Sequence, residues 1–273
     1  MSAGLSPGTR ERVLDRFGFT SPPTTDLDGL CRLYQEWCRQ VPFDNVRKLI
    51  ALHGEGRDGP LPGMDADDFL TAWLRHGTGG TCWPSANALG ALCTASGFST
   101  RLIAASMADI GIPTHGTTVV TLGTAEWLVD SSMLTDVPLR LDSRDVTAID
   151  HPVFATRATP VDQGWLFAFP LPYAPDPMPC RTIGPEGVTQ DYFMERYEAS
   201  RDASPFNAQV STRRNDDGGG VVSYGGAKRF RRTAAGIEET DLAGETLYAA
   251  LVDEFEMSDE IVDHLRSALA EPG

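Results

Sequence analysis

A cysteine follows two adjacent glycines in the segment Gly79-Gly80-Thr81-Cys82. Pro84 comes next at a position suited to a first helical turn, and Leu89, Leu92 and Cys93 continue with helical spacing. Cys82 is therefore predicted to lie where a tight turn enters a helix. A helix N-terminus stabilises a thiolate, which is the nucleophilic form of cysteine. The pattern predicts a reactive cysteine that can act as a nucleophile.

A thiol nucleophile needs a base, and the base needs a group that orients it. His115 begins one predicted strand, Asp130 closes the next, and Gly123-Thr124-Ala125 between them is a plausible hairpin turn. The two side chains are therefore expected at the same end of one ladder. The remaining histidines have the settings of surface or capping residues; they are His53, His76, His151 and His264. We predict a catalytic triad of Cys82, His115 and Asp130.

The other cysteines fit the ordinary role of a buried, structural thiol; they are Cys31, Cys38, Cys93 and Cys180. The chain begins without a basic region or a hydrophobic block, so a cytoplasmic protein with free thiols is expected. No metal-binding motif and no Gly-rich phosphate loop appears in the sequence, so a metal is not expected.

The 273 residues carry a net charge of −15 and contain no apolar run long enough to cross a bilayer. Nucleic acid and anionic membranes are therefore not expected as partners, because both need a surplus of Lys and Arg. The one dense basic cluster is Lys228-Arg229-Phe230-Arg231-Arg232. It is either the solvated edge of a strand or a phosphate-binding patch.

The periodicity of apolar residues divides the chain into three regions. Residues 1–97 are mainly helical and carry the predicted nucleophile. Residues 98–190 favour short strands and carry the predicted base and its partner. Residues 191–273 mix strands with two C-terminal helices, predicted at 241–255 and 258–269, and a strand is predicted at 206–212.

The ordered series of motifs resembles the arylamine N-acetyltransferase family. The motifs that carry the resemblance are Arg16-Phe17-Gly18-Phe19, Val41-Pro42-Phe43-Asp44-Asn45, Gly79-Gly80-Thr81-Cys82, Ser96-Gly97-Phe98, His115, Trp127-Leu128-Val129-Asp130, Ser204-Pro205-Phe206 and Leu251-Val252-Asp253-Glu254-Phe255. The resemblance covers nearly the whole chain, and the series is more specific than any one motif.

The resemblance implies an α+β fold: an N-terminal helical bundle, a central β-barrel and a C-terminal α/β lid. It implies ping-pong chemistry, in which acetyl-CoA acylates Cys82 before an amine, arylamine or hydrazine takes the acyl group. His115 would deprotonate the thiol and Asp130 would hold the imidazole.

Two sets of binding residues follow from the same resemblance. Phe43 and Phe206 either line the acceptor pocket or are plain core residues. CoA is placed between barrel and lid, and the basic residues of the lid segment are candidate contacts for its phosphates; they are Arg213, Arg214, Lys228, Arg229, Arg231 and Arg232.

The chain departs from the family pattern around the nucleophile. Thr78 stands where an Arg is expected, and Pro84 stands where a Glu is expected, as if a whole ion pair had been removed. Ala86 takes the place of an Asn, and Asn87 follows it. After Asp130, Ser131-Ser132-Met133-Leu134 replaces Val-Gly-Phe-Gly.

These departures leave other functions open. A close relative would be an amide synthase that takes an acyl chain from an acyl carrier protein and releases it as an amide or lactam. A cysteine hydrolase would use the same triad. A non-catalytic binding protein with this fold is the remaining alternative.

Overall fold

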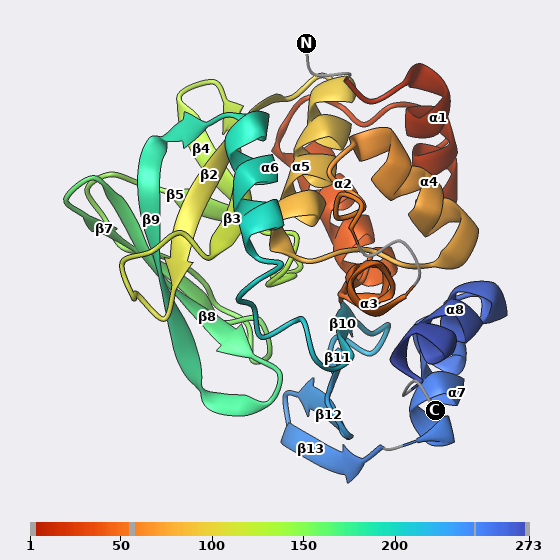
Figure 1. Ribbon diagram of the computed structural model, residues 1–273. Coiled ribbons are helices and arrows are strands. Elements are labelled where there is room, and N and C mark those ends of the chain that lie inside the picture. Colours follow the sequence, from red (N-terminus) through yellow and green to blue (C-terminus); the bar gives the residue numbers. More distant parts are fainter. Residues whose placement is uncertain (1–3, 55–57, 243, 271–273) are drawn as a thin grey trace.

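The N-terminal part of the chain is built from helices. In the computed structural model, which describes residues 4–54, 58–242 and 244–270, these helices occupy the upper right of Figure 1. They are α1 (Pro7–Arg16), α2 (Leu27–Gln40), α3 (Val46–His53), α4 (Ala66–His76) and α5 (Cys82–Ala95). Ser6, Asp26 and Asp65 cap α1, α2 and α4 by accepting a backbone N–H in the first turn. The helix α5 is buried on nearly every side, so the other elements pack around it.

An antiparallel sheet of eight strands follows and curls at the left of Figure 1. Its strands are β2 (Ser99–Met107), β3 (His115–Leu122), β4 (Ala125–Val129), β5 (Leu139–Leu141), β6 (Thr147–Ile149), β7 (Thr156–Val161), β8 (Gly164–Leu171) and β9 (Ala174–Val188). The spatial order is β5-β4-β3-β2-β9-β8-β7-β6. Its terminal strands, β5 and β6, contact each other, so the sheet nearly closes into a barrel around side chains such as Val119, Leu128 and Phe167.

The C-terminal part adds a helix against α5 and a second sheet. Its elements are α6 (Gln190–Ala199), β10 (Ser211–Asn215), β11 (Val221–Gly225), β12 (Lys228–Thr233), β13 (Gly236–Asp241), α7 (Glu245–Asp253) and α8 (Asp259–Leu269). A two-residue strand from the helical region, β1 (Phe43–Asp44), forms the edge of this sheet next to β10, with Phe43 opposite Arg213. The helical region and the C-terminal sheet are therefore joined by backbone pairing.

This architecture confirms the predicted α+β class, with a helical bundle, a barrel and an α/β C-terminal region. Within the described ranges, no helix is both long and apolar enough to cross a bilayer.

Two local predictions differ from the structure. The strand predicted at 206–212 begins only at Ser211. Before Ser211, the side-chain amide of Asn45 donates to the carbonyls of Phe206 and Gln209 and accepts the Ser211 N–H. The backbone groups of this loop therefore bond to one side chain, where a strand would bond to a neighbouring strand. The helix predicted from residue 241 starts at Glu245, because the acidic segment before it pairs with the basic strand β12 as β13.

Candidate active site

Cys82 is the first residue of α5, directly after a loop that packs closely on the strand β1. Its side chain lines a cavity, and its Sγ lies 3.7 Å from the carbonyl oxygen of Thr114. The loop has no room for side chains: a methyl group on Gly79 would lie 1.8 Å from the carbonyl oxygen of Pro42. The adjacent glycines thus allow the backbone to approach and hold the sulfur at the helix start.

A buried carboxylate anchors this loop. One oxygen of Asp44 accepts the Gly79 N–H at 2.5 Å, and the other accepts the Val46 N–H at 2.9 Å. Burial raises the pKa of Asp44 to about 6, with the two N–H donors opposing the shift. Thr78, at the position expected for Arg, is buried, and its hydroxyl has no hydrogen-bond partner in the part of the chain that the structure describes. The loop is therefore fastened through its backbone.

His115 and Asp130 meet at the end of the β3–β4 hairpin. Nε2 of His115 lies 2.7 Å from Oδ2 of Asp130, and both side chains are buried. The other carboxylate oxygen accepts the N–H groups of Ser132 and Met133 at 2.9 and 2.8 Å. With Nε2 committed to Asp130, Nδ1 is the ring nitrogen left for the hydrogen bond that links His115 to Cys82.

The segment after Asp130 folds back sharply in place of the family's glycine-containing turn. Leu134 has a positive φ of 52° and is fully buried, so its side chain packs in the core while its backbone takes a left-handed conformation that favours glycine. The hydroxyl of Tyr34 donates to the Asp130 carbonyl at 2.8 Å and accepts the Asp130 and Thr135 N–H groups, both at 3.1 Å. This buried hydroxyl holds both ends of the turn.

The opposite charges of His115 and Asp130 stabilise each other. Burial lowers the pKa of His115, but the negative charge and hydrogen bond of Asp130, with a smaller contribution from Cys82, raise it to about 10. Burial likewise opposes ionisation of Asp130, and the charged His115 and two backbone N–H groups hold its pKa below the ordinary value of 3.8. The imidazole is therefore protonated at neutral pH.

We expect the stability of the protein to fall at alkaline pH. The pKa of His115 rises from an ordinary 6.5 to about 10, so the folded protein binds a proton that the unfolded chain releases. The resulting stabilisation is complete below about pH 6.5 and is lost as the pH rises through about 10. Thermal unfolding across this range should show a falling Tm. In Asp130→Asn, which lacks the charge that raises the pKa, the fall should be smaller; an equal fall in both proteins would contradict the prediction.

The four other thiols have a different environment. Burial raises the pKa of Cys38, Cys93 and Cys180, and burial together with Asp28 raises that of Cys31. Each of these cysteines is disfavoured as a thiolate at neutral pH.

A cavity of about 460 Å³ opens beside Cys82. Its apolar lining includes Met107, Ile110, Ile112, Tyr173, Met178 and Phe206. Two cationic residues also line it: Lys48, on α3, and Arg196, on α6. Neither cation was singled out in the sequence. Lys48 was missed because the helix α3 itself was not predicted, although a lysine between Val46 and Leu49 on a short apolar helix is a usable signal.

The two aromatic residues predicted to line an acceptor pocket lie together, with ring centres 5.1 Å apart. Phe206 contributes to the wall of the cavity. Phe43 lies behind it, buried, with the Arg213 guanidinium 5.3 Å from its ring centre.

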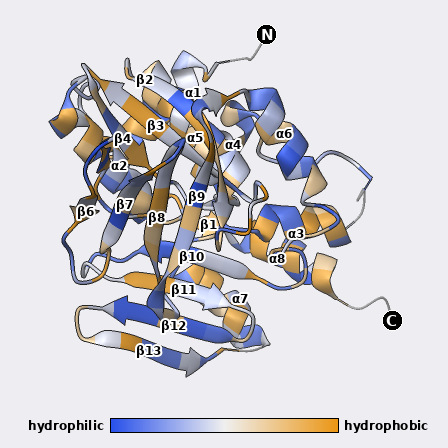
Figure 2. Ribbon diagram, turned by 90° about the vertical axis from the view of Figure 1, so that its left-hand side faces the viewer, coloured by the Kyte–Doolittle hydropathy of each residue, from blue (hydrophilic) through white to orange (hydrophobic). Residues whose placement is uncertain are grey.

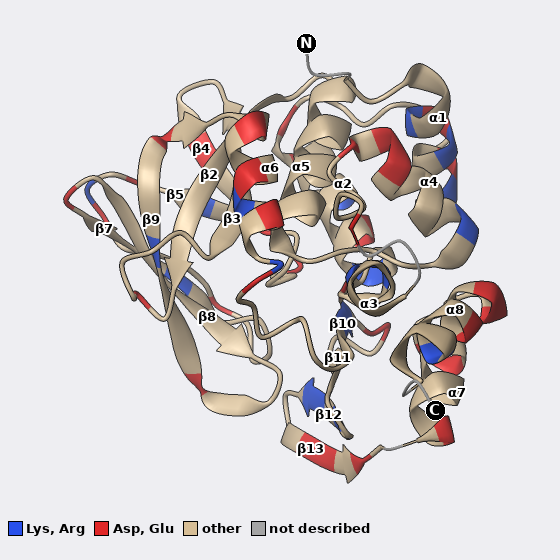
Figure 3. Ribbon diagram, viewed as in Figure 1, with Lys and Arg blue, Asp and Glu red and all other residues tan. Residues whose placement is uncertain are grey.

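The basic residues predicted for CoA are already engaged within the chain. Arg213 is buried, and Arg214 pairs with Glu256. The strand β12 lies beside the acidic β13 (Figure 3), and Figure 2 shows β12 as mainly hydrophilic. The basic side chains of β12 make these contacts: Lys228 with Glu239, Arg229 with Glu254, Arg231 with Asp216, and Arg232 with the carbonyls of Leu171 and Ala174. None of the six lines the cavity beside Cys82.

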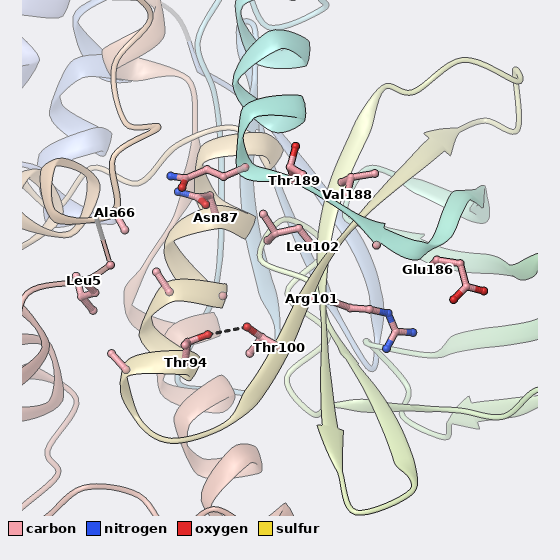
Figure 4. Close-up of a pocket in the computed structure, with 16 residues that line it drawn as sticks. Leu5, Ala66, Asn87, Thr94, Thr100, Arg101, Leu102, Glu186, Val188 and Thr189 are labelled. Carbon is pink, nitrogen blue, oxygen red and sulfur yellow. Dashed lines mark hydrogen bonds between the residues drawn. The ribbon is translucent and has the colours of Figure 1, made fainter. Parts of the chain in front are cut away.

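The asparagine that follows Ala86 faces away from Cys82. Asn87 donates to the carbonyl of Met64 at 2.7 Å and lines a separate cavity of about 650 Å³ between α5 and β2, together with Leu102 and Val188 (Figure 4). The one-residue shift of this asparagine turns it by about 100° around the helix axis and removes it from the Cys82 side.

The comparisons with known proteins agree with this architecture. A family model described as N-acetyltransferase matches residues 26–257, so the chain belongs to this family, and the predicted resemblance is confirmed. No curated protein matches the sequence.

Several solved structures share the fold at low sequence identity. The arylamine N-acetyltransferase of Mycobacterium marinum, solved in complex with CoA, is 17% identical with a TM-score of 0.80, covering 95% of this chain and 97% of that chain. The enzyme of Mycobacterium abscessus is 19% identical with a TM-score of 0.76, covering 96% and 94%. The Salmonella typhimurium enzyme is 17% identical with a TM-score of 0.77, covering 97% and 99%.

Proposed function

We propose that this protein is an acetyl-CoA-dependent N-acyltransferase that passes the acyl group through Cys82 to an amine, arylamine or hydrazine. The observation that carries the proposal is the 2.7 Å contact between His115 and Asp130, which leaves the second ring nitrogen for Cys82 at the start of α5. Membership of the N-acetyltransferase family and the CoA complex of the M. marinum enzyme support the donor. Residues 1–97 would supply the nucleophile, 98–190 the base and its partner, and 191–273 the lid.

In the first half-reaction, the Cys82 thiolate attacks the carbonyl carbon of the thioester. The bond from that carbon to the sulfur of CoA breaks, and CoA leaves as a thiol that takes the proton held by His115. The products are acyl-Cys82 and neutral His115. Asp130 keeps the imidazole oriented and stabilises its charged form.

In the second half-reaction, the amine nitrogen attacks the acyl-Cys82 carbonyl. His115 accepts the proton that the amine loses, and the Cys82 thiolate leaves as the amide forms. The protonated His115 and the thiolate are then restored, so the cycle needs no other reactant.

Intact-protein mass spectrometry tests this proposal directly. After mixing with acetyl-CoA alone, the protein should gain the mass of one acetyl group, located by peptide mapping on Cys82. Adding an arylamine should return the original mass and yield the N-acetyl product. Loss of the acetyl group in water at the same rate without amine would identify a hydrolase, and no acetylation would overturn the proposal.

We also propose that some of the lid cations contact the phosphates of CoA, which the family resemblance places between barrel and lid. Neutralising Lys228, Arg229, Arg231 and Arg232 together should raise the apparent KM for acetyl-CoA with little change in kcat, because such contacts are equal in ground and transition states. The S-acetyl thioester of N-acetylcysteamine lacks the phosphates, so its KM should stay unchanged in the same variant. Equal use of both donors by the wild type would contradict the phosphate contacts and favour the amide synthase alternative.

A further inference from the structure

The cavity beside Cys82 has an electrostatic character opposite to that of the whole protein. The chain carries a net charge of −15, and acidic residues are spread over its helices and strands (Figure 3). The described residues that line this cavity nevertheless include two cations, Lys48 and Arg196, and no Asp or Glu. In a protein with such an excess of acid, this local reversal indicates a site for an anion.

Lys48 is a buried residue that lines the cavity. Its side chain is 2% exposed, and its Nζ donates to Oγ of Ser200 at 2.8 Å and to the Ser200 carbonyl at 3.3 Å. An ammonium group has three N–H donors, so one remains beyond these two bonds, and Nζ also lies 5.7 Å from the centre of the Tyr197 ring. Glu198 acts on Lys48 only at longer range and pairs with Arg201 at 3.2 Å. In the described ranges, Lys48 has no carboxylate within 4 Å.

The charge on Lys48 is retained at neutral pH. Burial lowers its pKa, while the negative charge of Cys82 acts in the opposite direction, and the resulting value is about 8. The cation and the nucleophile share one cavity and stabilise each other. An anionic ligand beside Lys48 would bind a cation that has already lost its hydration, so a charge-assisted hydrogen bond there would be strong.

Arg196, on α6, supplies the second cation of the cavity lining. Its Nε is buried and has no hydrogen-bond partner among the described residues, and its guanidinium lies 5.7 Å from the centre of the Tyr192 ring. A buried guanidinium N–H without a partner costs free energy, so this arginine is not satisfied by the described residues alone. The planar fork of arginine matches a carboxylate in particular.

Taking the proposed acyl transfer as its basis, we propose that Lys48 and Arg196 form a subsite for a carboxylate carried by the substrate of Cys82. The apolar wall formed by residues such as Ile112 and Tyr173 would hold the remainder of that molecule. The carboxylate can come from two sources, an amine acceptor such as an aminobenzoate or an acyl group such as malonyl. The phosphates of CoA do not suit the subsite, because the pantetheine arm separates them from the thioester that must reach Cys82.

Alkylation of Cys82 tests the subsite without any acyl transfer. Iodoacetate carries a carboxylate, whereas iodoacetamide has nearly the same shape and no charge. The ratio of the two alkylation rates, followed by intact mass and peptide mapping, should be higher for Cys82 than for free cysteine. In Lys48→Met with Arg196→Gln, this ratio should fall by about tenfold or more, the loss expected for a charge-assisted contact. A general effect on thiolate reactivity cancels in the ratio.

Arg201→Gln is the matched control, because it also removes one positive charge near Lys48 but from a residue paired with Glu198. It should leave the ratio nearly unchanged. The single variant Arg196→Gln serves if the double variant does not fold, because Arg196 is only half-buried. This single change should also lower the ratio. An unchanged ratio in both variants, with the folded state verified by thermal unfolding, would overturn the subsite.

Steady-state kinetics identify the source of the carboxylate. A KM increase in the double variant for 4-aminobenzoate but not for aniline assigns the carboxylate to the acceptor. An increase for a malonyl thioester but not for the acetyl thioester assigns it to the acyl group. Equal changes for charged and neutral substrates would overturn the proposal. If no thioester acylates Cys82, the proposed acyl transfer fails, while the alkylation ratio still decides the subsite.

Discussion

Replacing Cys82 with alanine should abolish the acyl-enzyme and lower turnover by roughly 10⁵-fold or more, the loss that follows removal of a catalytic nucleophile. The reason is specific to this thiol. Cys82 begins α5 and lines the cavity, whereas the other four cysteines have raised pKa values that disfavour their thiolates. The measurement is the mass gained on mixing with acetyl-CoA, together with the rate of amide formation.

Cys93→Ala is the control for this change, because Cys93 is buried on the same helix but outside the cavity. It should keep acylation while losing some stability. Limiting iodoacetamide should label Cys82 first in the wild type. Preferential labelling of another cysteine, or acetylation of the Cys82→Ala variant, would show that the nucleophile is assigned to the wrong residue.

Replacing Asp130 with asparagine should lower kcat by about 10⁴-fold, as the corresponding change does in serine proteases. The asparagine keeps the size of the side chain but offers one acceptor oxygen in place of two. The carboxylate currently serves His115 with one oxygen and the Ser132 and Met133 N–H groups with the other. The amide would therefore present an N–H to the imidazole and favour the wrong tautomer.

Asp145→Asn, at an exposed position of the barrel, is the matched control and should have normal turnover. Circular dichroism should show that Asp130→Asn remains folded. Near-normal acyl transfer in the folded Asp130→Asn protein would remove Asp130 from the catalytic group. If Asp130→Asn does not fold, Asp130→Glu replaces it in the experiment. The longer side chain still accepts hydrogen bonds but displaces the carboxylate, so turnover should fall strongly.

The meeting of His115 and Asp130 could be predicted because it depends on local sequence. The turn at Gly123 joins two short β-rich runs, and the antiparallel ladder, with Thr118 opposite Val129, then carries both residues to one end. The start of a helix at Cys82 was predictable for the same reason, since glycines and a proline mark the turn within a few residues. Signals within a few residues of the chain were enough to predict where these three side chains lie.

The cationic side of the cavity could not be predicted in this way. Lys48 and Arg196 lie on two helices far apart in the sequence, and only the packing of the whole molecule brings them to one cavity. Their proposed role depends on a third property, the lack of a carboxylate within 4 Å among the described residues, which no sequence pattern reports.

The long strand β9 was missed because its composition argues against a strand. It contains Pro175, Pro177 and Pro179, and prolines are normally excluded from central strands. In the structure, β9 pairs with β2 only from Cys180 onward, so the proline segment is paired on one side, with β8. The period-two spacing turns the missing N–H groups of these three prolines to the same side of the strand.

The loss of an ion pair near the nucleophile was visible in the sequence, but its replacement was not. The sequence showed that Thr78 and Pro84 had replaced two charged residues. It did not show that Asp44 would hold Gly79 through a backbone N–H. Such contacts leave no signature, because every residue except proline carries the same donor at position 79.

The pairing of β1 with β10 has a consequence for the order in which the protein is made. Phe43 and Asp44 leave the ribosome early, yet their partners Arg213 and Thr212 are translated only after the barrel. Until then the backbone that holds the nucleophile loop has an open edge, and contacts between such distant residues form slowly. A nascent chain can thus contain Cys82, His115 and Asp130 without a finished site. Thioester chemistry would begin only after nearly the whole polypeptide has been synthesised.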